Sequence, residues 1–263
     1  MAARVNHPLC ARLYVRQSRE AERLGLAERR SRLLDGLAGK VLEVGAGNGR
    51  NFAHYPPPVT EVVAVEPERH LRELAQRAAR DAPVPVTVVD AVAEELPFTA
   101  AAFDAAVASL MLCSVADVPA ALAEVHRVLR PGAELRFFEH VASPRPALRA
   151  LQRAADATVW PHLSGGCHLA RETDRLIEAA GFAIERCDRF TFRIPPVDPP
   201  KTHVLGVARR LHAGVERSVM HGRARPTRER RDGTGHGRRR GDGGTPRAGP
   251  RADDRRASGS RRR

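Results

Sequence analysis

The stretch VLEVGAGNG at residues 41–49 decides the fold. A β-forming run ends there in three glycines at alternate positions, Gly45, Gly47 and Gly49, and a helix follows. Glycines at such a turn allow a tight bend and let a ligand approach the backbone closely. The dinucleotide fingerprint is GxGxxG, whereas these glycines are spaced as GxGxG and Arg50 stands at the sixth position. The spacing therefore indicates a nucleotide site but disfavours an NAD(P)-linked oxidoreductase.

Further β runs alternate with helical patterns on the C-terminal side of this loop. The five strands predicted first cover residues 40–47, 60–67, 85–90, 103–110 and 133–141. The predicted helices cover residues 8–24, 27–37, 70–80, 118–130 and 169–180, and two closing strands cover 182–190 and 202–208. Strands separated by helices of this length predict βαβ units and a parallel sheet, and two closing strands joined by a loop can pair antiparallel.

An acidic residue, Glu66, ends the second β run, 21 residues after Gly45. A carboxylate at that place can accept hydrogen bonds from both ribose hydroxyls of an adenosine. A solvated strand end is the plainer alternative for a lone Glu66. Together with the glycine loop, the pattern favours ribose binding.

Length and composition fit one α/β domain with an extension. The chain has 263 residues, and no run of about 18 apolar residues predicts a membrane-spanning helix. The first residues do not resemble a signal peptide, so we expect a cytoplasmic location. The four cysteines, which form no CxxC pair, are predicted to be reduced thiols that pack in the core: Cys10, Cys113, Cys167 and Cys187.

The net charge of +13 is concentrated at the C-terminal end. Residues 209–263 contain 18 arginines and six acidic residues, whereas residues 1–208 are close to neutral. Such a segment has too few apolar residues to offset its ordering entropy, so we predict a disordered Arg/Gly-rich tail. A coding region read in an unselected frame is the alternative. The folded part therefore does not predict specific nucleic-acid binding, and the tail lacks the aromatic residues that stack on bases.

Five stretches, in this order and at this spacing, resemble class I S-adenosylmethionine-dependent methyltransferases: residues 41–49, 62–67, 93–98, 103–108 and 124–135. Four more are similar to the branch that includes the alkyl-thiol methyltransferases of animals: residues 51–56, 110–115, 137–141 and 165–173. The resemblance implies a Rossmann-like α/β fold. Its sheet would have seven mostly parallel strands with an antiparallel last strand, and helices on both faces.

The same resemblance implies a domain plan and a cofactor site for S-adenosyl-L-methionine. Helices in residues 1–38 would cover the cofactor, residues 39–208 would form the catalytic domain, and residues 142–170 would form an insertion on the acceptor side. Glu43 and the loop of Gly45, Ala46, Gly47, Asn48 and Gly49 would hold the methionine part. Glu66 would bind the ribose, and Pro67, Ala93 and Glu94 would border the adenine. Ser109 and Leu110 would line the sulfonium side. Relatives often have Asp where this chain has Val92, and Asp90 lies two residues earlier.

Methyl transfer from a sulfonium needs alignment and exclusion of water, and it requires no metal. Candidates for the acceptor pocket are His7, Tyr14, Cys113, His140, Trp160, Cys167, His168 and Arg171. His140 ends the fifth strand, where it could act as a base or cap a backbone group. Cys167 and His168 together with His140 could suggest a metal, but adjacent ligands without a fourth partner disfavour one, so none is expected.

The sequence thus predicts an S-adenosylmethionine-dependent methyltransferase that acts on a small molecule. A thiol or sulfide is the favoured acceptor, since a thiol with a pKa of about 8.5 supplies some thiolate at neutral pH. C- or O-methylation of a quinone-type or phenolic acceptor is the alternative. An NAD(P)-linked oxidoreductase and a catalytically silent cofactor-binding protein are less favoured. Oligomeric state is left open.

Overall fold

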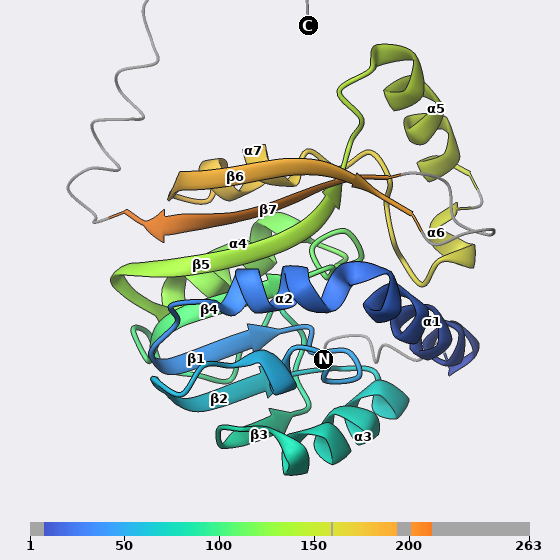
Figure 1. Cartoon of the computed structure of the whole chain (residues 1–263). Coiled ribbons are helices and arrows are strands. Elements are labelled where there is room, and N and C mark those ends of the chain that lie inside the picture. Colours follow the sequence, from blue (N-terminus) through green and yellow to red (C-terminus); the bar gives the residue numbers. More distant parts are fainter. Residues whose placement is uncertain (1–7, 159, 194–200, 212–263) are drawn as a thin grey trace, which may run out of the picture. The chain divides into compact units, whose positions relative to one another are not determined.

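Seven strands form one sheet in the computed structural model, which describes residues 8–158, 160–193 and 201–211 (Figure 1). The strands are β1 (Gly39–Val44), β2 (Val59–Val65), β3 (Val86–Val89), β4 (Phe103–Ser109), β5 (Leu129–Val141), β6 (Phe182–Phe192) and β7 (Lys201–Arg210). Their order is β3-β2-β1-β4-β5-β7-β6. The first five strands pair in parallel, and β7 pairs antiparallel with both β5 and β6. The predicted mostly parallel sheet with an antiparallel last strand is confirmed.

Helices cover both faces of this sheet (Figure 1). They are α1 (Pro8–Ala21), α2 (Ala27–Leu34), α3 (Arg69–Ala78), α4 (Val118–Val128), α5 (Pro146–Asp156), α6 (Trp160–Leu163) and α7 (Thr173–Ala179). Short turns of other helical types lie at Glu22–Leu26, Phe52–His54 and Ala79–Asp81. Helices α4 and α7 pack on one face, while α1, α2 and α3 pack on the other.

The hydrophobic core lies in two layers because successive strand residues point to opposite faces. In β1, Leu42 packs with the α4 layer and Val41 packs with the α2 layer, and neither is exposed to solvent. Burial of each such side chain contributes about 1.5–3 kcal/mol relative to exposure. The two layers together fix the sheet and therefore the positions of the loops at its carboxyl edge.

The close pairing of β5 and β7 depends on a glycine. Gly206 lies opposite Phe137 in the register of the two strands. A Cβ atom at Gly206 would lie 2.4 Å from the Phe137 ring and 2.3 Å from the carbonyl oxygen of Arg186. The ring of Phe137, which is not exposed to solvent, therefore occupies the space that any other residue at 206 would need.

The predicted helices over 8–24, 27–37, 70–80, 118–130 and 169–180 were all longer than the observed ones, and two of the differences have a clear local cause. The helix expected over 118–130 ends at Val128, because Leu129 already has an extended backbone and begins β5. The helix expected over 169–180 begins only at Thr173. The carboxylate of Asp156 accepts the backbone N–H groups of 169 and 170 at 2.7 and 2.8 Å, so that stretch is held as a loop.

The N-terminal helices are joined by a kink instead of a loop. A π-type turn at Glu22–Leu26 connects α1 to α2, and Gly25 in it has φ +103°. A backbone with that φ favours glycine. The kink lets α1 turn away from α2 and reach the glycine loop.

One expectation about the cysteines was also wrong. Cys187 is exposed on β6, so it does not pack in the core, whereas Cys113 is buried and both Cys10 and Cys167 are half-buried. The predicted start of the tail at residue 209 was too early, because Arg209 and Arg210 pair in β7. From position 212 onward the predicted tail lies outside the described residues, and so does His7. In the described ranges, every helix is too short or too polar to span a bilayer.

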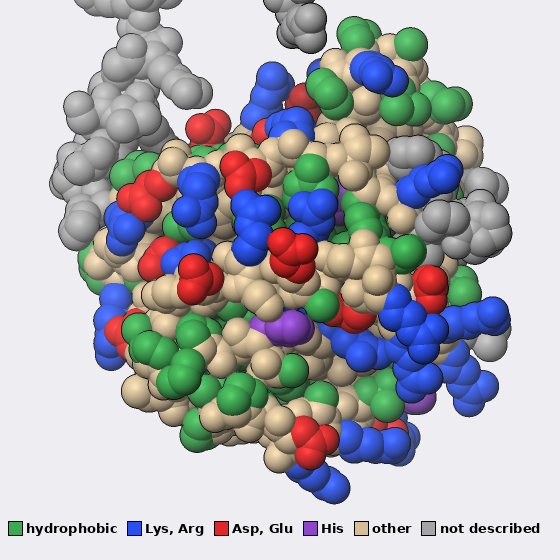
Figure 2. All heavy atoms as spheres, viewed as in Figure 1, with side chains coloured by type: hydrophobic (Ala, Val, Ile, Leu, Met, Phe, Trp, Pro, Cys, Tyr) green, Lys and Arg blue, Asp and Glu red, His purple; other side chains and the backbone are tan. Residues whose placement is uncertain are grey.

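Figure 2 shows the charges on one face of the molecule. Basic side chains gather over α1, whose exposed residues include Arg12, Arg16 and Arg19. Across the middle and upper part of this face, acidic and basic side chains are interspersed. This mixed distribution agrees with the nearly neutral charge of the first 208 residues.

Candidate active site

The glycine loop leaves β1 with a left-handed backbone at three positions. The φ angles of Gly45, Gly47 and Gly49 are +70°, +57° and +77°. Any other residue is strained at such angles. A Cβ atom at Gly45 would also lie 2.6 Å from the Met111 side chain, and one at Gly49 would lie 2.9 Å from Phe52. The loop therefore requires glycine for its conformation and for its close packing.

Glu66 holds this loop from the neighbouring strand. It directly follows β2, and its carboxylate accepts the backbone N–H groups of Gly47 at 2.7 Å and Glu68 at 2.9 Å. Only 6% of the residue is exposed. Burial raises the pKa of Glu66 to about 7, although the two amide donors oppose that rise. A nearly buried carboxylate thus lies beside the glycine loop, at the position where the sequence predicts a residue that binds ribose.

Helix α1 covers the loop. A Cβ atom at Gly47 would lie 3.0 Å from the hydroxyl oxygen of Tyr14. Burial raises the pKa of Tyr14, so its hydroxyl keeps its proton. The amide of Asn48 donates to Ser18 Oγ at 3.0 Å, while Asn48 Oδ1 is buried and has no hydrogen-bond partner among the described residues. Helix α1 therefore closes over the glycines and leaves one buried acceptor oxygen free.

Glu43 lies in β1, just before the glycine loop, and its carboxylate is buried and already hydrogen-bonded within the protein. It accepts hydrogen bonds from the Tyr55 hydroxyl at 2.7 Å and the Asn51 amide at 2.9 Å. Burial raises the pKa of Glu43 to about 7, and both hydrogen bonds oppose the rise. In this arrangement Glu43 orients the residues that follow the glycine loop.

A buried arginine links this network to β4. Arg30 of α2 is 3% exposed and donates to Asn51 Oδ1 at 2.7 Å, Ser109 Oγ at 3.1 Å and Glu22 at 2.8 Å. Sequence reasoning missed Arg30, because nothing distinguishes it from the other arginines of the N-terminal helices. Asn51 fell within the NFAHYP segment that carried the family resemblance, but it was given no role.

The loop after β4 is held by one carboxylate from β5. Glu139 is not exposed to solvent, and it accepts the backbone N–H groups of Met111 and Leu112 at 2.9 Å each and of Cys113 at 3.3 Å. Burial raises the pKa of Glu139 to about 7. Leu110, before these three residues, has φ +57°, which is strained for leucine. Such strain persists only where the surroundings fix the backbone.

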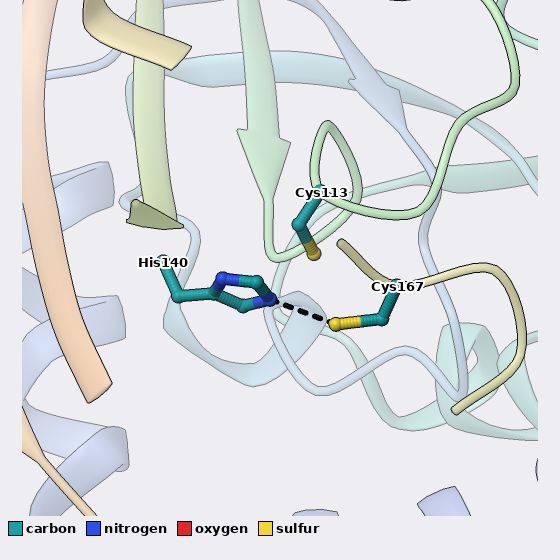
Figure 3. Close-up of side chains that lie close together, drawn as sticks. All are labelled: Cys113, His140 and Cys167. Carbon is teal, nitrogen blue, oxygen red and sulfur yellow. Dashed lines mark hydrogen bonds between the residues drawn. The ribbon is translucent and has the colours of Figure 1, made fainter. Parts of the chain in front are cut away.

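The side chains of two cysteines and one histidine meet near the ends of β4 and β5 (Figure 3). The two sulfur atoms of Cys113 and Cys167 and one ring nitrogen of His140 all lie within 4.8 Å of one another, and His140 Nε2 lies 2.9 Å from Cys167 Sγ. The neighbouring Cys113 and the His140 ring lower the pKa of the Cys167 thiol. The same contact and burial raise the pKa of Cys113. We call these three residues the Cys–His–Cys cluster.

The remaining acceptor-side candidates support the loop that carries Cys167. The backbone N–H of His168 donates to the carbonyl of Cys113 at 2.8 Å, and Arg171 donates to the carbonyl of Leu112 at 2.5 Å. The His168 ring lies 2.8 Å from the Gly166 carbonyl, and Arg171 lies 3.1 Å from that ring. Trp160 is half-buried on α6, with the Lys201 ammonium 5.4 Å from its ring centroid.

The residues predicted to contact adenine make contacts within the protein. Ala93 is buried, and the Glu94 carboxylate accepts the backbone N–H groups of 116 and 117 at 3.1 and 3.2 Å. The Pro67 carbonyl accepts a hydrogen bond from Arg72 at 2.8 Å, and Arg72 also pairs with Asp90 at 2.9 Å. Asp90 is therefore engaged in an ion pair with Arg72, and it does not take the place of the aspartate expected at position 92, which is valine in this chain.

The structure thus brings the predicted residues together in two groups at the carboxyl edge of the sheet. The first contains the glycine loop, Glu66 and Tyr14, and the second is the Cys–His–Cys cluster with its supporting loop. Ser109, the last residue of β4, accepts a hydrogen bond from Arg30 at 3.1 Å and so belongs to the Arg30 network.

Comparisons with known proteins fit this arrangement. The methyltransferase domain family matches residues 42–137. Thiol S-methyltransferase TMT1B of Homo sapiens is 34% identical over 182 residues, which cover 66% of this chain and 73% of that protein. Demethylmenaquinone methyltransferase of Thermus thermophilus is 31% identical over 151 residues, which cover 57% and 66%. A methyltransferase-type protein of Bacillus halodurans superposes with a TM-score of 0.59 at 17% identity, covering 71% of this chain and 99% of that one.

Proposed function

We propose that this chain, which belongs to the thiol S-methyltransferase family, transfers a methyl group from S-adenosylmethionine to the sulfur of a small thiol. Its membership makes it an S-adenosylmethionine-dependent methyltransferase that acts on a small molecule. The proposal concerns the residues that bind the cofactor and the chemical class of the acceptor.

The glycine loop and Glu66 together are the observation that carries the cofactor site. The loop has no side chains at Gly45, Gly47 and Gly49, and a nearly buried carboxylate lies against it at 2.7 Å from Gly47 N. The free oxygen of Asn48 adds a buried acceptor that a bound amine or hydroxyl can satisfy. These residues fit a nucleoside with a charged amino-acid end.

We assign each part of the cofactor to residues on this surface. Glu66 would accept the ribose hydroxyls, and Gly45–Gly49 with Tyr14 above them would enclose the methionine part. Pro67, Ala93 and Glu94 would border the adenine, mainly through backbone groups, because the Glu94 carboxylate already binds two amides. Ser109 and Leu110 would line the side of the sulfonium.

S-adenosylmethionine, when bound, supplies a methyl group that its positive sulfur already activates. The protein then has to align an acceptor with that group and exclude water. The buried end of β4, the strained Leu110 and the cover from α1 support both tasks. A strong base is not required for a thiol, since part of it is thiolate near neutral pH.

The thiol acceptor is supported by the family relationship. The demethylmenaquinone methyltransferase is a more distant relative of this chain, and carbon acceptors need more help from a base. The predicted role of His140 as that base stays a prediction. Its Nε2 is engaged with Cys167 at 2.9 Å, so this nitrogen is not free to receive a proton from an acceptor without losing that contact.

The test is transfer of a labelled methyl group by the full chain to small thiols, hydrogen sulfide, phenols and quinols. We expect a thioether product from at least one thiol. Glu66→Gln should raise KM for S-adenosylmethionine, whereas Glu61→Gln, the same change at a partly exposed site of β2, should not. Products from phenols or quinols alone would overturn the thiol assignment. Turnover unchanged by Glu66→Gln would overturn the cofactor site.

A further inference from the structure

Two thiols and an imidazole from three separate segments converge in the Cys–His–Cys cluster (Figure 3). Cys113 comes from the loop after β4, His140 from the end of β5 and Cys167 from the loop before α7. We propose that these three side chains bind a zinc ion and that the acceptor thiol takes the fourth coordination position. The statement about the acceptor rests on the proposed function, whereas the metal site itself does not.

The donor set is one that zinc prefers. Thiolate sulfur and imidazole nitrogen are its usual protein ligands, and three protein ligands with an open fourth position are typical of catalytic sites. The cluster supplies this set within the described residues, and no carboxylate that would favour a harder ion belongs to it. Zinc also requires no change of oxidation state during the reaction.

The spacing of the three atoms suits a tetrahedral ion after a small adjustment. Bond lengths of about 2.3 Å to sulfur and about 2.0 Å to nitrogen place tetrahedral ligand atoms about 3.5–3.8 Å apart. All three atoms lie within 4.8 Å of one another. His140 Nε2 and Cys167 Sγ, now 2.9 Å apart, would have to separate by about 0.6 Å to reach that spacing. Small side-chain rotations supply such a shift.

Contacts that do not involve the sulfur atoms hold the ligands near each other. The His168 N–H to Cys113 carbonyl bond joins the two cysteine loops at 2.8 Å. Glu139 fixes the backbone of Cys113, and as the neighbour of His140 on β5 it ties that loop to the strand carrying the third ligand. This prearranged backbone lowers the cost of ordering a site around an ion.

The expectation that this chain holds no metal rested on Cys167 and His168 being adjacent in sequence and on the lack of a fourth ligand at a useful spacing. In the structure His168 is directed to the Gly166 carbonyl and to Arg171, and Cys113 provides the third ligand instead. Cys113 lies 54 residues before Cys167, so sequence spacing did not connect them.

The open position explains how a neutral thiol becomes a nucleophile. The acceptor R–SH would bind the ion as R–S⁻ and release its proton to solvent. The acceptor sulfur then forms a bond to the methyl carbon as the bond from that carbon to the sulfonium sulfur breaks. The products are a thioether and S-adenosylhomocysteine, and the neutral thioether is a weak ligand that leaves the ion.

The first experiment measures the metal content of the full chain, purified without chelators, by mass spectrometry of the elements. We expect about one zinc per chain. Cys113→Ser and Cys167→Ser should lose it, while Cys187→Ser, a change at an exposed cysteine, should retain it. Thermal melting and cofactor binding of each variant show whether it is folded. Wild-type protein that binds S-adenosylmethionine but takes up no zinc would overturn the metal site and leave the proposed function intact.

Cobalt substitution tests the ligands and the acceptor position directly. Co²⁺ in the full chain should give sulfur-to-metal charge-transfer absorption that Cys113→Ser weakens, and an added small thiol should intensify it. A metal spectrum that no active thiol changes would overturn the acceptor position. Failure to methylate any thiol, with zinc present, would instead overturn the proposed function. A disulfide between Cys113 and Cys167 in protein purified under reducing conditions would overturn the site.

Discussion

The raised pKa of Glu66 predicts that cofactor affinity depends on pH. With a pKa of about 7 in the free protein, this carboxyl is mostly protonated at pH 6 and mostly ionised at pH 8. A protonated carboxyl accepts fewer hydrogen bonds from ribose, so binding must first displace the proton. One pKa unit corresponds to a factor of ten, and we therefore expect affinity about tenfold weaker at pH 6 than at pH 8. Above pH 8 the effect should level off.

Calorimetric titration of S-adenosylmethionine at pH 6, 7 and 8, at constant ionic strength, measures this dependence. Glu66→Gln cannot ionise, so it should lose the tenfold component while binding more weakly throughout. Glu61→Gln, whose side chain pairs with Lys40 on the surface, should keep the wild-type slope. Any slope shared by all three proteins belongs to other groups, including the amino group of the ligand. The same slope in wild type and Glu66→Gln would refute the reasoning.

Three further predictions test the surroundings of the site. Gly47→Ala places a Cβ atom 3.0 Å from the Tyr14 hydroxyl at φ +57°. It should cost about 1–2 kcal/mol in chemical denaturation and weaken cofactor binding. Gly36→Ala, at φ +77° in the turn before β1 and with its nearest contact at 3.8 Å, should also lower stability but spare binding. Arg30→Met leaves a buried network without its cation and should lower the free energy of unfolding by about 3–5 kcal/mol, against about 0–1 kcal/mol for the exposed Arg32→Met. Truncation after residue 211 leaves β7 intact and removes most of the basic residues of the tail. Any binding to duplex DNA, measured by fluorescence anisotropy, should be lost, while cofactor affinity should not change. Equal DNA binding by the truncated chain would contradict the prediction that the tail carries the DNA-binding charge.

The cofactor side could be predicted from sequence because its signals are local. The glycines at 45, 47 and 49 follow one strand, and Glu66 follows the next, so parallel pairing of β1 and β2 alone places them together. The antiparallel last strand was likewise implied by a resemblance that spans the domain. The start of α7 could not be predicted, since it depends on a hydrogen bond that the backbone N–H of Leu169 donates to the carboxylate of Asp156, 13 residues earlier in the chain.

The acceptor side and the buried network depend on long-range contacts. Cys113, His140 and Cys167 meet only because β4 pairs with β5 and because backbone hydrogen bonds join two loops. Arg30 becomes part of the site only when α2 packs on the sheet and brings it to Ser109, 79 residues away in the chain. A single sequence contains no periodicity that encodes such pairs.

The most direct test of the central claim is a crystal structure of the full chain with bound S-adenosylhomocysteine. We predict that the ribose hydroxyls lie within about 3 Å of the Glu66 carboxylate oxygens. The thioether sulfur should face the end of β4 and the Cys–His–Cys cluster, with the amino-acid part enclosed by the glycine loop and α1. A ligand bound away from the glycine loop, or one whose sulfur points away from the cluster, would contradict the claim that methyl groups are delivered there.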